Sequence, residues 1–278
     1  MFKGFFEGWY FKHQNKLNTV SIIPGISNSK AFIQVITEDE SYNIDFPKEK
    51  FFKREESVVI NENVFSRKGI KINIKKKDLS IKGEIFYHNL TPLKNDIMGP
   101  FRFFPLECRH GIISMYHNLS GEIEINGKVF DFNDGIGYIE KDSGHSFPKS
   151  YAWIHSNDFE EKCSVMVAIA DIPFLGFHFR GLICSVYCQE KEYIIATYNN
   201  GKILKCTREE ILICNTTLKL YIRISDIEEK SLYSPISGEM KGIIKESPSC
   251  RAQFKFFKNE DLLFDLTSLK TSSEFFGY

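Results

Sequence analysis

The densest group of side chains able to move a proton lies between residues 135 and 157. Glu140 and Asp142 supply carboxyl groups there, and His145 supplies an imidazole. A carboxylic acid can protonate a weakly basic group when it lies close to that group and when apolar surroundings raise its pKa. The glycines within residues 135–137 permit a sharp bend that aims a carboxyl group inward. We therefore expect Glu140 or Asp142 to be a catalytic acid, assisted by His145.

The segment that follows, residues 151–157, carries aromatic and polar side chains on one face. Successive side chains of an extended strand point to opposite faces, so every second residue faces the same way. The face that begins with Tyr151 has the composition of a pocket wall, whereas the face that holds Ala152 and Ile154 suits a core. The binding residues expected from this region are Tyr138, Phe147, Tyr151, Trp153, His155 and Asn157.

Two earlier segments, one near the start of the chain and one that ends at Gly111, hold further candidates. In the first, Glu7 needs a partner if it is buried, because an unpaired buried carboxylate is costly, and Lys12 or Arg102 is the expected partner. In the second, Glu107 is a further candidate for the catalytic acid. The binding residues expected from these segments are Glu7, Trp9, Tyr10 and His110.

Each of these features also has a purely structural explanation. Trp9 can plug one end of a barrel, and the acids on either side of Lys141 can form a solvated turn with local ion pairs. His145 can brace a loop, and His155 can be a core histidine whose nitrogens are satisfied. The concentration of acids, imidazoles and aromatic rings in one short stretch favours a functional site over these explanations.

No metal or cofactor is expected. His110 and His117 are too far apart in sequence for a local pair of ligands, and the sequence has no His-Glu-x-x-His motif and no cysteine and histidine spacing typical of zinc sites. The seven cysteines include no Cys-x-x-Cys pair. Because no secretory signal precedes them, we expect free buried thiols and a cytoplasmic protein.

The charge balance argues against nucleic acid as a partner. Lys and Arg together number 36, as do Asp and Glu, so the formal net charge is zero, whereas capture of nucleic acid needs a basic excess. The 26 Phe residues supply aromatic surface of the kind that lines pockets for apolar ligands. The expected partner is an apolar small molecule, and a transient contact with a membrane surface stays open.

Alternation with a period of two dominates the chain and predicts β-strands. Ile70, Ile72 and Ile74 alternate with polar residues, and so do the apolar residues between 218 and 224. Many short strands with frequent turn signals are typical of a sandwich or a barrel. The sequence therefore predicts an all-β fold.

Turn residues and helical segments refine this prediction. Asn126-Gly127 and Asn200-Gly201 are typical of tight hairpins between the strands that flank them. Helical periodicity is limited to two short stretches, 47–53 and 207–212. A barrel of about eight strands takes roughly 100–150 residues, so the chain has room for two. We expect two antiparallel barrels, an N-terminal one at 1–130 and a C-terminal one at 131–278.

Three motifs together resemble the tocopherol cyclase family. They are Phe-Glu-Gly-Trp-Tyr-Phe-Lys at 6–12, Gly-Pro-Phe at 99–101 with Glu-Cys-x-His-Gly at 107–111, and Gly-Tyr-Ile-Glu-Lys-Asp-x-Gly-x-Ser-Phe-Pro at 137–148. The resemblance runs over most of the chain in the same order. It departs at Ser143, Tyr151 and His155, where Trp, Trp and Gln are more usual.

The resemblance implies tandem lipocalin-like (calycin) barrels, distantly like carotenoid hydratases, and a cyclase that closes a prenylated hydroquinol into a chromanol without a cofactor. In such a reaction an acid protonates an alkene, and a phenol oxygen or water captures the tertiary cation. Aromatic faces stabilise that cation, and Trp9, Tyr138, Tyr151 and Trp153 are the candidates.

We therefore expect a cyclase or hydratase, an isomerase if it cyclises, that acts on a prenylated quinol or terpenoid alkene. The alternative is a non-catalytic carrier of a lipid, quinone or pigment. An acid at the floor of the pocket favours the enzyme, whereas acids confined to its rim favour the carrier.

Overall fold

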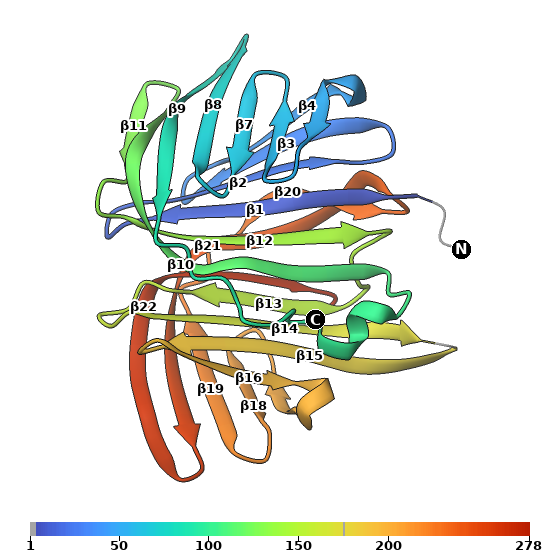
Figure 1. The fold of residues 1–278 in the computed structure, drawn as a ribbon, viewed down its shortest axis with the longest axis vertical. Coiled ribbons are helices and arrows are strands. Elements are labelled where there is room, and N and C mark those ends of the chain that lie inside the picture. Colours follow the sequence, from blue (N-terminus) through green and yellow to red (C-terminus); the bar gives the residue numbers. More distant parts are fainter. Residues whose placement is uncertain (1–3, 175) are drawn as a thin grey trace.

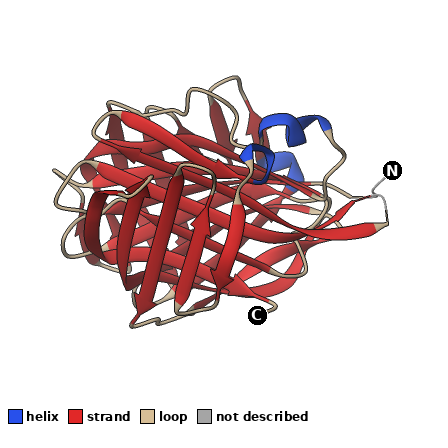
Figure 2. Cartoon of the chain, turned by 90° about the horizontal axis from the view of Figure 1, so that it is seen from below, coloured by secondary structure: helices blue, strands red, loops and turns tan. Residues whose placement is uncertain are grey.

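The computed structural model describes residues 4–174 and 176–278, and nearly all of them lie in strands (Figures 1 and 2). Helical structure in the described residues is limited to three short 3₁₀ segments: η1 (Lys48–Lys50), η2 (Gly99–Phe103) and η3 (Thr197–Asn199). The prediction of an all-β fold is confirmed. The helix expected at 47–53 is a single 3₁₀ turn, and the one expected at 207–212 is wrong, since β18 (Glu210–Cys214) begins within it.

The first sheet contains 12 antiparallel strands within the described residues, in the order β4-β3-β2-β1-β12-β10-β9-β8-β7-β6-β5, with β11 paired to β10. Their bounds are β1 (Phe6–Gln14), β2 (Thr19–Ile26), β3 (Lys30–Thr37), β4 (Ser41–Pro47), β5 (Phe51–Lys53), β6 (Ser57–Ile60), β7 (Asn63–Ser66), β8 (Gly69–Lys76), β9 (Leu79–His88), β10 (Cys108–Ile125), β11 (Lys128–Asp131) and β12 (Ile136–Gly144).

The second sheet contains 10 antiparallel strands within the described residues, in the order β16-β15-β14-β13-β22-β21-β19-β18-β17, with β20 paired to β21. Their bounds are β13 (Tyr151–Ser156), β14 (Cys163–Phe174), β15 (Phe177–Cys188), β16 (Lys191–Ala196), β17 (Lys202–Cys206), β18 (Glu210–Cys214), β19 (Leu218–Ser225), β20 (Lys230–Ile236), β21 (Glu239–Lys258) and β22 (Asp261–Phe276).

Each sheet encloses its own apolar core, built by the alternation visible in the sequence. In β8, Ile70, Ile72 and Ile74 are buried in the first core while Lys71 and Asn73 are exposed. The first core draws residues from both ends of its sheet, β2 to β4 and β6 to β9, so the sheet curls around it. The second core does the same with β14 to β16 and with β18, β19, β21 and β22.

The hydrogen-bonded strand pairs do not close either sheet into a barrel. In the described residues, β4 pairs only with β3, β5 only with β6, β16 only with β15 and β17 only with β18, so the end strands of neither sheet pair with each other. The observed architecture is two curled antiparallel sheets.

The chain passes from the first sheet to the second later than expected. β12 returns to the first sheet, where it pairs with both β1 and β10, so the sheets divide between Gly144 and Tyr151 and not at residue 131. The hairpin at Asn126-Gly127 is confirmed, because it joins β10 to β11 with both residues at positive φ. The hairpin at Asn200-Gly201 is wrong, since β16 and β17 lie at opposite ends of the second sheet.

The two sheets lie against each other, with β1 and β12 of the first near β13 and β22 of the second (Figure 1). A third apolar cluster joins them, with Tyr10 and Tyr138 from the first sheet and Trp153 and Met166 from the second. β20 also reaches across to β3, where the Gln34 side chain bonds the backbone of Tyr233 through both its amide nitrogen and its oxygen, at 3.0 and 2.7 Å.

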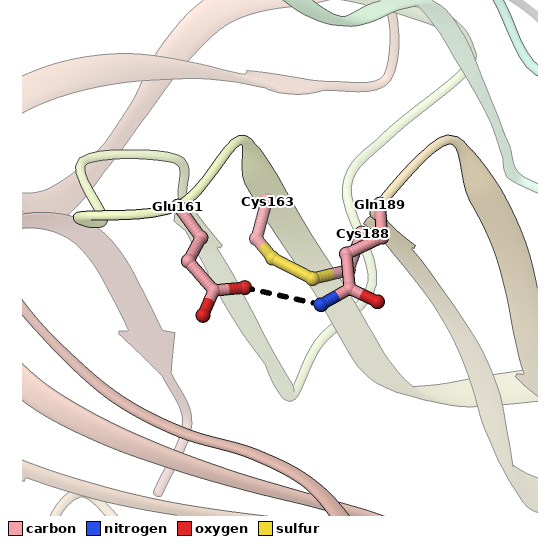
Figure 3. The surroundings of a disulfide bond; sticks show 4 residues. All are labelled: Glu161, Cys163, Cys188 and Gln189. Atoms are coloured by element: carbon pink, nitrogen blue, oxygen red, sulfur yellow. Dashed lines mark hydrogen bonds between the residues drawn. A yellow bond between two sulfur atoms is a disulfide. The ribbon is translucent and has the colours of Figure 1, made fainter.

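One pair of cysteines corrects the expectation of free thiols. Cys163 and Cys188 face each other across β14 and β15 and form a disulfide, with Glu161 and Gln189 hydrogen-bonded beside it (Figure 3). Because 25 residues separate the two cysteines, the sequence did not show that they are cross-strand neighbours. Five other cysteines are free. Among the described residues, no helix has the length and apolar character needed to cross a membrane.

Candidate functional site

A large cavity lies between the two sheets. Its empty space amounts to about 1320 Å³, open solvent at its mouth included, and its walls are mainly apolar. The first sheet contributes side chains from β1, β10 and β12, and the second contributes side chains from β13, β14, β15, β21 and β22. Strands at the centre of each sheet therefore build the facing walls.

Strand alternation explains which side chains reach this cavity. On β1, Phe6 and Tyr10 turn toward the cavity, whereas Phe11 packs in the core of the first sheet. On β13, Tyr151 and Trp153 face the cavity, while Ala152 and Ile154 pack in the core of the second sheet. This is the division of faces expected from the sequence of residues 151–157.

An imidazole lies between two carboxyl groups on the first-sheet wall. β10 pairs with β12 so that His110 is opposite Asp142, and Glu140 lies two residues along on the same face. The His110 Nδ1 donates to Asp142 Oδ1 at 3.0 Å, and its Nε2 lies 3.4 Å from Glu140 Oε2, an ion-pair distance without hydrogen-bond geometry. Burial disfavours a charge on His110, but the two carboxylates outweigh it and raise the His110 pKa to about 9.

Glu140 has further partners in the same cluster. Its Oε2 accepts hydrogen bonds from the Tyr138 hydroxyl at 2.5 Å and from the Trp153 indole at 3.1 Å. Burial raises the pKa of Glu140 above its usual range, and Asp142 adds to this, while His110 opposes it. We call Glu140, His110 and Asp142 the first-sheet acid cluster.

A second group of acids lines the opposite wall. Glu246 on β21 is opposite Glu274 on β22, and Glu274 is opposite Trp153 on β13, so the three side chains share one face. The Tyr10 hydroxyl donates to Glu246 Oε1 at 2.5 Å and accepts from Ser21 at 2.8 Å. Burial raises the Glu246 pKa to about 7.

Glu274 differs from every other acid of the cavity. It is 8% exposed, and its Oε1 has no hydrogen-bond partner among the described residues. Burial raises its pKa well above the usual range for a glutamate, and the nearby Asp142 and Glu140 add to the shift. The surroundings of Glu274 therefore favour its protonated form.

The structure brings most of the expected site residues to this cavity. Eight of them line it: Trp9, Tyr10, His110, Glu140, Asp142, Phe147, Tyr151 and Trp153. The Trp9 ring itself packs in the core of the first sheet, where it stacks on Phe51, and both Lys53 and Lys141 lie over it. Lys141 therefore points away from Glu140 and Asp142, as the alternation along β12 requires.

Three expected binding residues lie behind the wall instead. Tyr138 is fully buried and reaches the site only through its bond to Glu140. His155 stacks on the Tyr138 ring, with centroids 3.7 Å apart, and Asn157 accepts from Gln14 at 2.6 Å. They support the first-sheet acid cluster from outside the cavity.

Glu107, His145 and Glu7 do not line the cavity. The Glu107 carbonyl accepts the backbone N–H of His145 at 2.7 Å, just beyond the end of β12, so these residues shape a loop. Glu7 forms ion pairs with Lys53, at 2.5 Å, and with Lys141.

The partners expected for Glu7 were therefore wrong. Lys12 alternates to the other face of β1, where it is fully buried and donates to the backbone oxygen of Lys270 at 2.8 Å. Burial lowers the Lys12 pKa to about 7. Arg102 is exposed in η2.

Sequence reasoning missed Glu246 and Glu274, although a signal for both was present. In β21 the residues before Glu246 alternate between buried and exposed, and Glu246 falls at a buried position. Glu274 ends a run of small polar residues at the buried end of β22. A glutamate at a core position of an alternating strand is a candidate for a site, because burial of an unpaired acid is costly.

One group of residues in the cavity has the spacing of a metal site. The ligand atoms of His110, Glu140 and Asp142 lie within 4.8 Å of one another. With both ring nitrogens directed at carboxylates, the His110 imidazolium occupies the position between them that a cation would take. The other such group in the described chain, around Cys163, contains the disulfide.

Comparison with known proteins supports the resemblance seen in the motifs. A family model described as tocopherol cyclase-like matches residues 78–205. The matched segment contains the whole first-sheet acid cluster and β13 but not β1, Glu246 or Glu274. No curated protein matches the sequence.

Solved structures resemble the chain over nearly its full length. A putative AttH from Nitrosomonas europaea covers 100% of this chain and 93% of its own, with a TM-score of 0.55 and 10% identity. Kievitone hydratase from Nectria haematococca covers 99% and 89%, with a TM-score of 0.58 and 7% identity. CghA covers 98% and 88%, with a TM-score of 0.58 and 8% identity. At these identities the similarity is one of fold.

Proposed function

Starting from the confirmed resemblance to the tocopherol cyclase family, we propose that this protein catalyses a cofactor-free, acid-catalysed cyclisation or hydration of a prenylated quinol or terpenoid alkene. The observation that carries the proposal is the presence of buried carboxyl groups with raised pKa values inside one apolar cavity. An alkene is a very weak base, so its protonation requires a neutral acid held close to it in dry surroundings.

The proposed reaction needs only groups that the cavity supplies. The Glu140 carboxyl gives its proton to one alkene carbon, and the other carbon becomes a tertiary cation. A phenol oxygen of the same molecule, or a water molecule, adds to that cation and forms a C–O bond. The oxygen then loses a proton, which the Glu140 carboxylate takes up, so the acid is regenerated.

Neighbouring side chains support these steps. The faces of Trp153 and Tyr10, which lie edge to face at 5.2 Å, stabilise the cation. Asp142 holds His110, which takes the assisting role that the sequence suggested for His145. The apolar walls fold the prenyl chain toward the acid.

Three further features of the protein, its fold type, its reaction class and its location, are part of the same proposal. We propose that the curled sheets are lipocalin-like barrels, that the cyclisation is an isomerase reaction on a prenylquinone precursor, and that the protein acts in the cytoplasm. The curvature of the two cores supports the first of these statements.

A second candidate function is a carrier for an apolar lipid, quinone or pigment. The observation in its favour is that Glu140 already accepts two protein hydrogen bonds while His110 lies beside it. Such a cluster is stable without performing chemistry.

Turnover of a prenylated hydroquinol tests the two functions. Glu140→Gln keeps the shape of the side chain and removes the acid, so we expect a loss of at least about 100-fold in turnover with binding retained. Glu124→Gln is the matched control, because Glu124 pairs with Lys82 outside the cavity.

The outcomes separate the candidates. Asp142→Asn should lower turnover less than Glu140→Gln, because Asp142 acts through His110. Wild-type turnover by Glu140→Gln would place the acid elsewhere in the cavity. A wild-type protein that binds the hydroquinol tightly and never turns over an alkene would be a carrier, and native mass spectrometry with extraction would then identify its cargo.

A further inference from the structure

The second-sheet wall of the cavity presents two polar groups that the protein leaves without partners. These are the Oε1 atom of Glu274 and the hydroxyl of Tyr151. Both side chains are 8% exposed, and neither atom has a hydrogen-bond partner among the described residues. Because a buried polar group without a partner costs free energy, two of them in one wall call for an explanation.

Strand pairing places these two side chains next to each other. β13 pairs with β22, so that Tyr151 is opposite Phe276 and Trp153 is opposite Glu274. Tyr151 and Glu274 are thus diagonal neighbours on one face of adjacent strands, a separation of roughly 7–8 Å that long side chains can bridge. Both line the cavity, so their free polar groups face the same space.

Their protonation decides what they can bind. Burial, together with the nearby acids Asp142 and Glu140, favours the protonated form of Glu274, and in that form its carboxyl O–H can donate a hydrogen bond. The Tyr151 hydroxyl is also a donor. Two donors side by side match an oxygen atom with two lone pairs, and a carbonyl oxygen has this arrangement.

The surroundings favour a neutral ligand group. An anionic ligand group would meet the acids Glu140, Asp142 and Glu246 around the same cavity. An ammonium group carries no acceptor atom, so it cannot accept a hydrogen bond from either donor. The walls are largely apolar, so the rest of the ligand is apolar as well.

We propose that Glu274 and Tyr151 form a subsite that binds the carbonyl oxygen of an apolar ketone, enone or quinone through two hydrogen bonds. This subsite rests on the proposed function only in assigning the substrate to this cavity, and among the proposed substrates it favours an alkene that also carries a carbonyl group over a hydroquinol, which has hydroxyl groups in place of carbonyls. A neutral carboxylic acid paired with a tyrosine hydroxyl is an arrangement that enzymes use to stabilise a carbonyl oxygen as negative charge develops on it.

Binding of fluorenone and fluorene tests the subsite without any turnover. The two molecules share one rigid apolar skeleton, and only fluorenone has a carbonyl group. Calorimetric titration should show that wild-type protein binds fluorenone at least about 10-fold more tightly than fluorene, since each hydrogen bond contributes about 1 kcal/mol. The carbonyl stretch of bound fluorenone should lie at lower frequency than that of the free molecule in an alkane.

Variants identify the donors. Tyr151→Phe and Glu274→Met should each reduce the preference for fluorenone about 5-fold, with little change for fluorene. Glu274→Gln keeps a donor and should retain most of the preference and of the frequency shift. Tyr151→Phe preserves the ring, so it remains informative if Glu274→Met folds poorly.

Two results would overturn the subsite. One is an unchanged preference for fluorenone in Tyr151→Phe and Glu274→Met, and the other is an equal loss of fluorene binding, which would show a packing role alone. A protein that binds fluorenone as expected but turns over no alkene would lose the proposed function and keep the subsite. Turnover of an alkene without a preference for fluorenone would support the proposed function and overturn the subsite.

Discussion

The two walls of the cavity treat buried polar groups in opposite ways. On the first-sheet wall, His110 lies between Glu140 and Asp142, and Glu140 also accepts from Tyr138 and Trp153. On the second-sheet wall, Glu274 and Tyr151 face the cavity with polar atoms that lack partners among the described residues. On the first wall both acids have protein partners, whereas on the second wall Glu274 Oε1 and the Tyr151 hydroxyl are left to a ligand.

The difference follows from the chemistry of the strand neighbours and not from depth of burial. His110 is the cross-strand neighbour of Asp142, so the first acid cluster receives a cation. Glu274 has Trp153 on one side and Glu246 on the other, and neither supplies a positive charge. Glu140 and Glu274 are both buried, so their different neighbours leave one acid beside a cation and the other without one.

Removal of the cation should produce the largest change in stability. The His110 pKa rises from 6.5 to about 9 in the folded protein, which corresponds to about 3 kcal/mol of stability. A raised histidine pKa contributes fully below 6.5 and is lost as the pH rises through about 9. We therefore expect His110→Gln to lose about 3 kcal/mol in urea unfolding at pH 6.5.

The control for this prediction is the double variant with Glu140→Gln, which also removes one of the carboxylates left unpaired. It should recover part of the loss, because the two sites are coupled. If His110→Gln unfolds at the wild-type urea concentration, the first-sheet cluster does not depend on its cation, and the contrast between the walls fails.

Glu246 should lower stability over a more acidic pH range than the one in which the His110 cation is lost. Burial raises its pKa from 4.5 to about 7, so the folded protein retains a proton that the unfolded chain releases. For an acid with a raised pKa, stability is highest below 4.5 and falls as the pH rises to about 7. Relative to Glu246→Gln, wild-type protein should lose about 2 kcal/mol between pH 4.5 and pH 6.

Thermal and urea unfolding over this pH range measure the effect, with Glu124→Gln as the matched control outside the cavity. The sign is opposite to that expected of a carboxylate held by a cation. A difference that does not change with pH would show that the Tyr10 bond and Lys12 keep Glu246 ionised throughout.

The sequence was sufficient where local alternation decides the outcome. The period of two in residues 151–157 predicted one shared face for Tyr151, Trp153 and His155, of which the first two line the cavity and His155 lies behind its wall. The same rule placed Glu140 and Asp142 together, with Lys141 on the opposite face. It failed for His145, because β12 ends at Gly144 and the next residue bonds to the Glu107 carbonyl in a loop. His110, which was expected only to bind the substrate, lies beside the two acids, where an assisting His145 was expected.

Local sequence patterns did not predict which strands pair when they are far apart in the chain. Glu246 and Glu274 reach the cavity because β22 pairs with β13, a contact between segments more than 100 residues apart. The disulfide between Cys163 and Cys188 and the passage of the chain between sheets after Gly144 depend on strand partners in the same way. Composition and spacing predict strands, but they do not specify which strands become neighbours.

The smallest effect we predict compares the same substitution on the two walls. The Tyr138 hydroxyl donates to Glu140, so Tyr138→Phe removes a hydrogen bond to a charged or partly charged acceptor and should cost about 1.5 kcal/mol. The Tyr151 hydroxyl has no partner among the described residues, so Tyr151→Phe should change stability by less than about 0.5 kcal/mol. Both rings are buried and keep their packing, which leaves the hydroxyl as the only difference.

Urea unfolding of both variants without ligand measures the contrast. If Tyr151→Phe is as costly as Tyr138→Phe, the Tyr151 hydroxyl is satisfied in the free protein, and the second wall is as complete as the first. If fluorenone stabilises wild-type protein more than Tyr151→Phe, the hydroxyl gains its partner from the ligand, and the two walls differ in the way that the structure indicates.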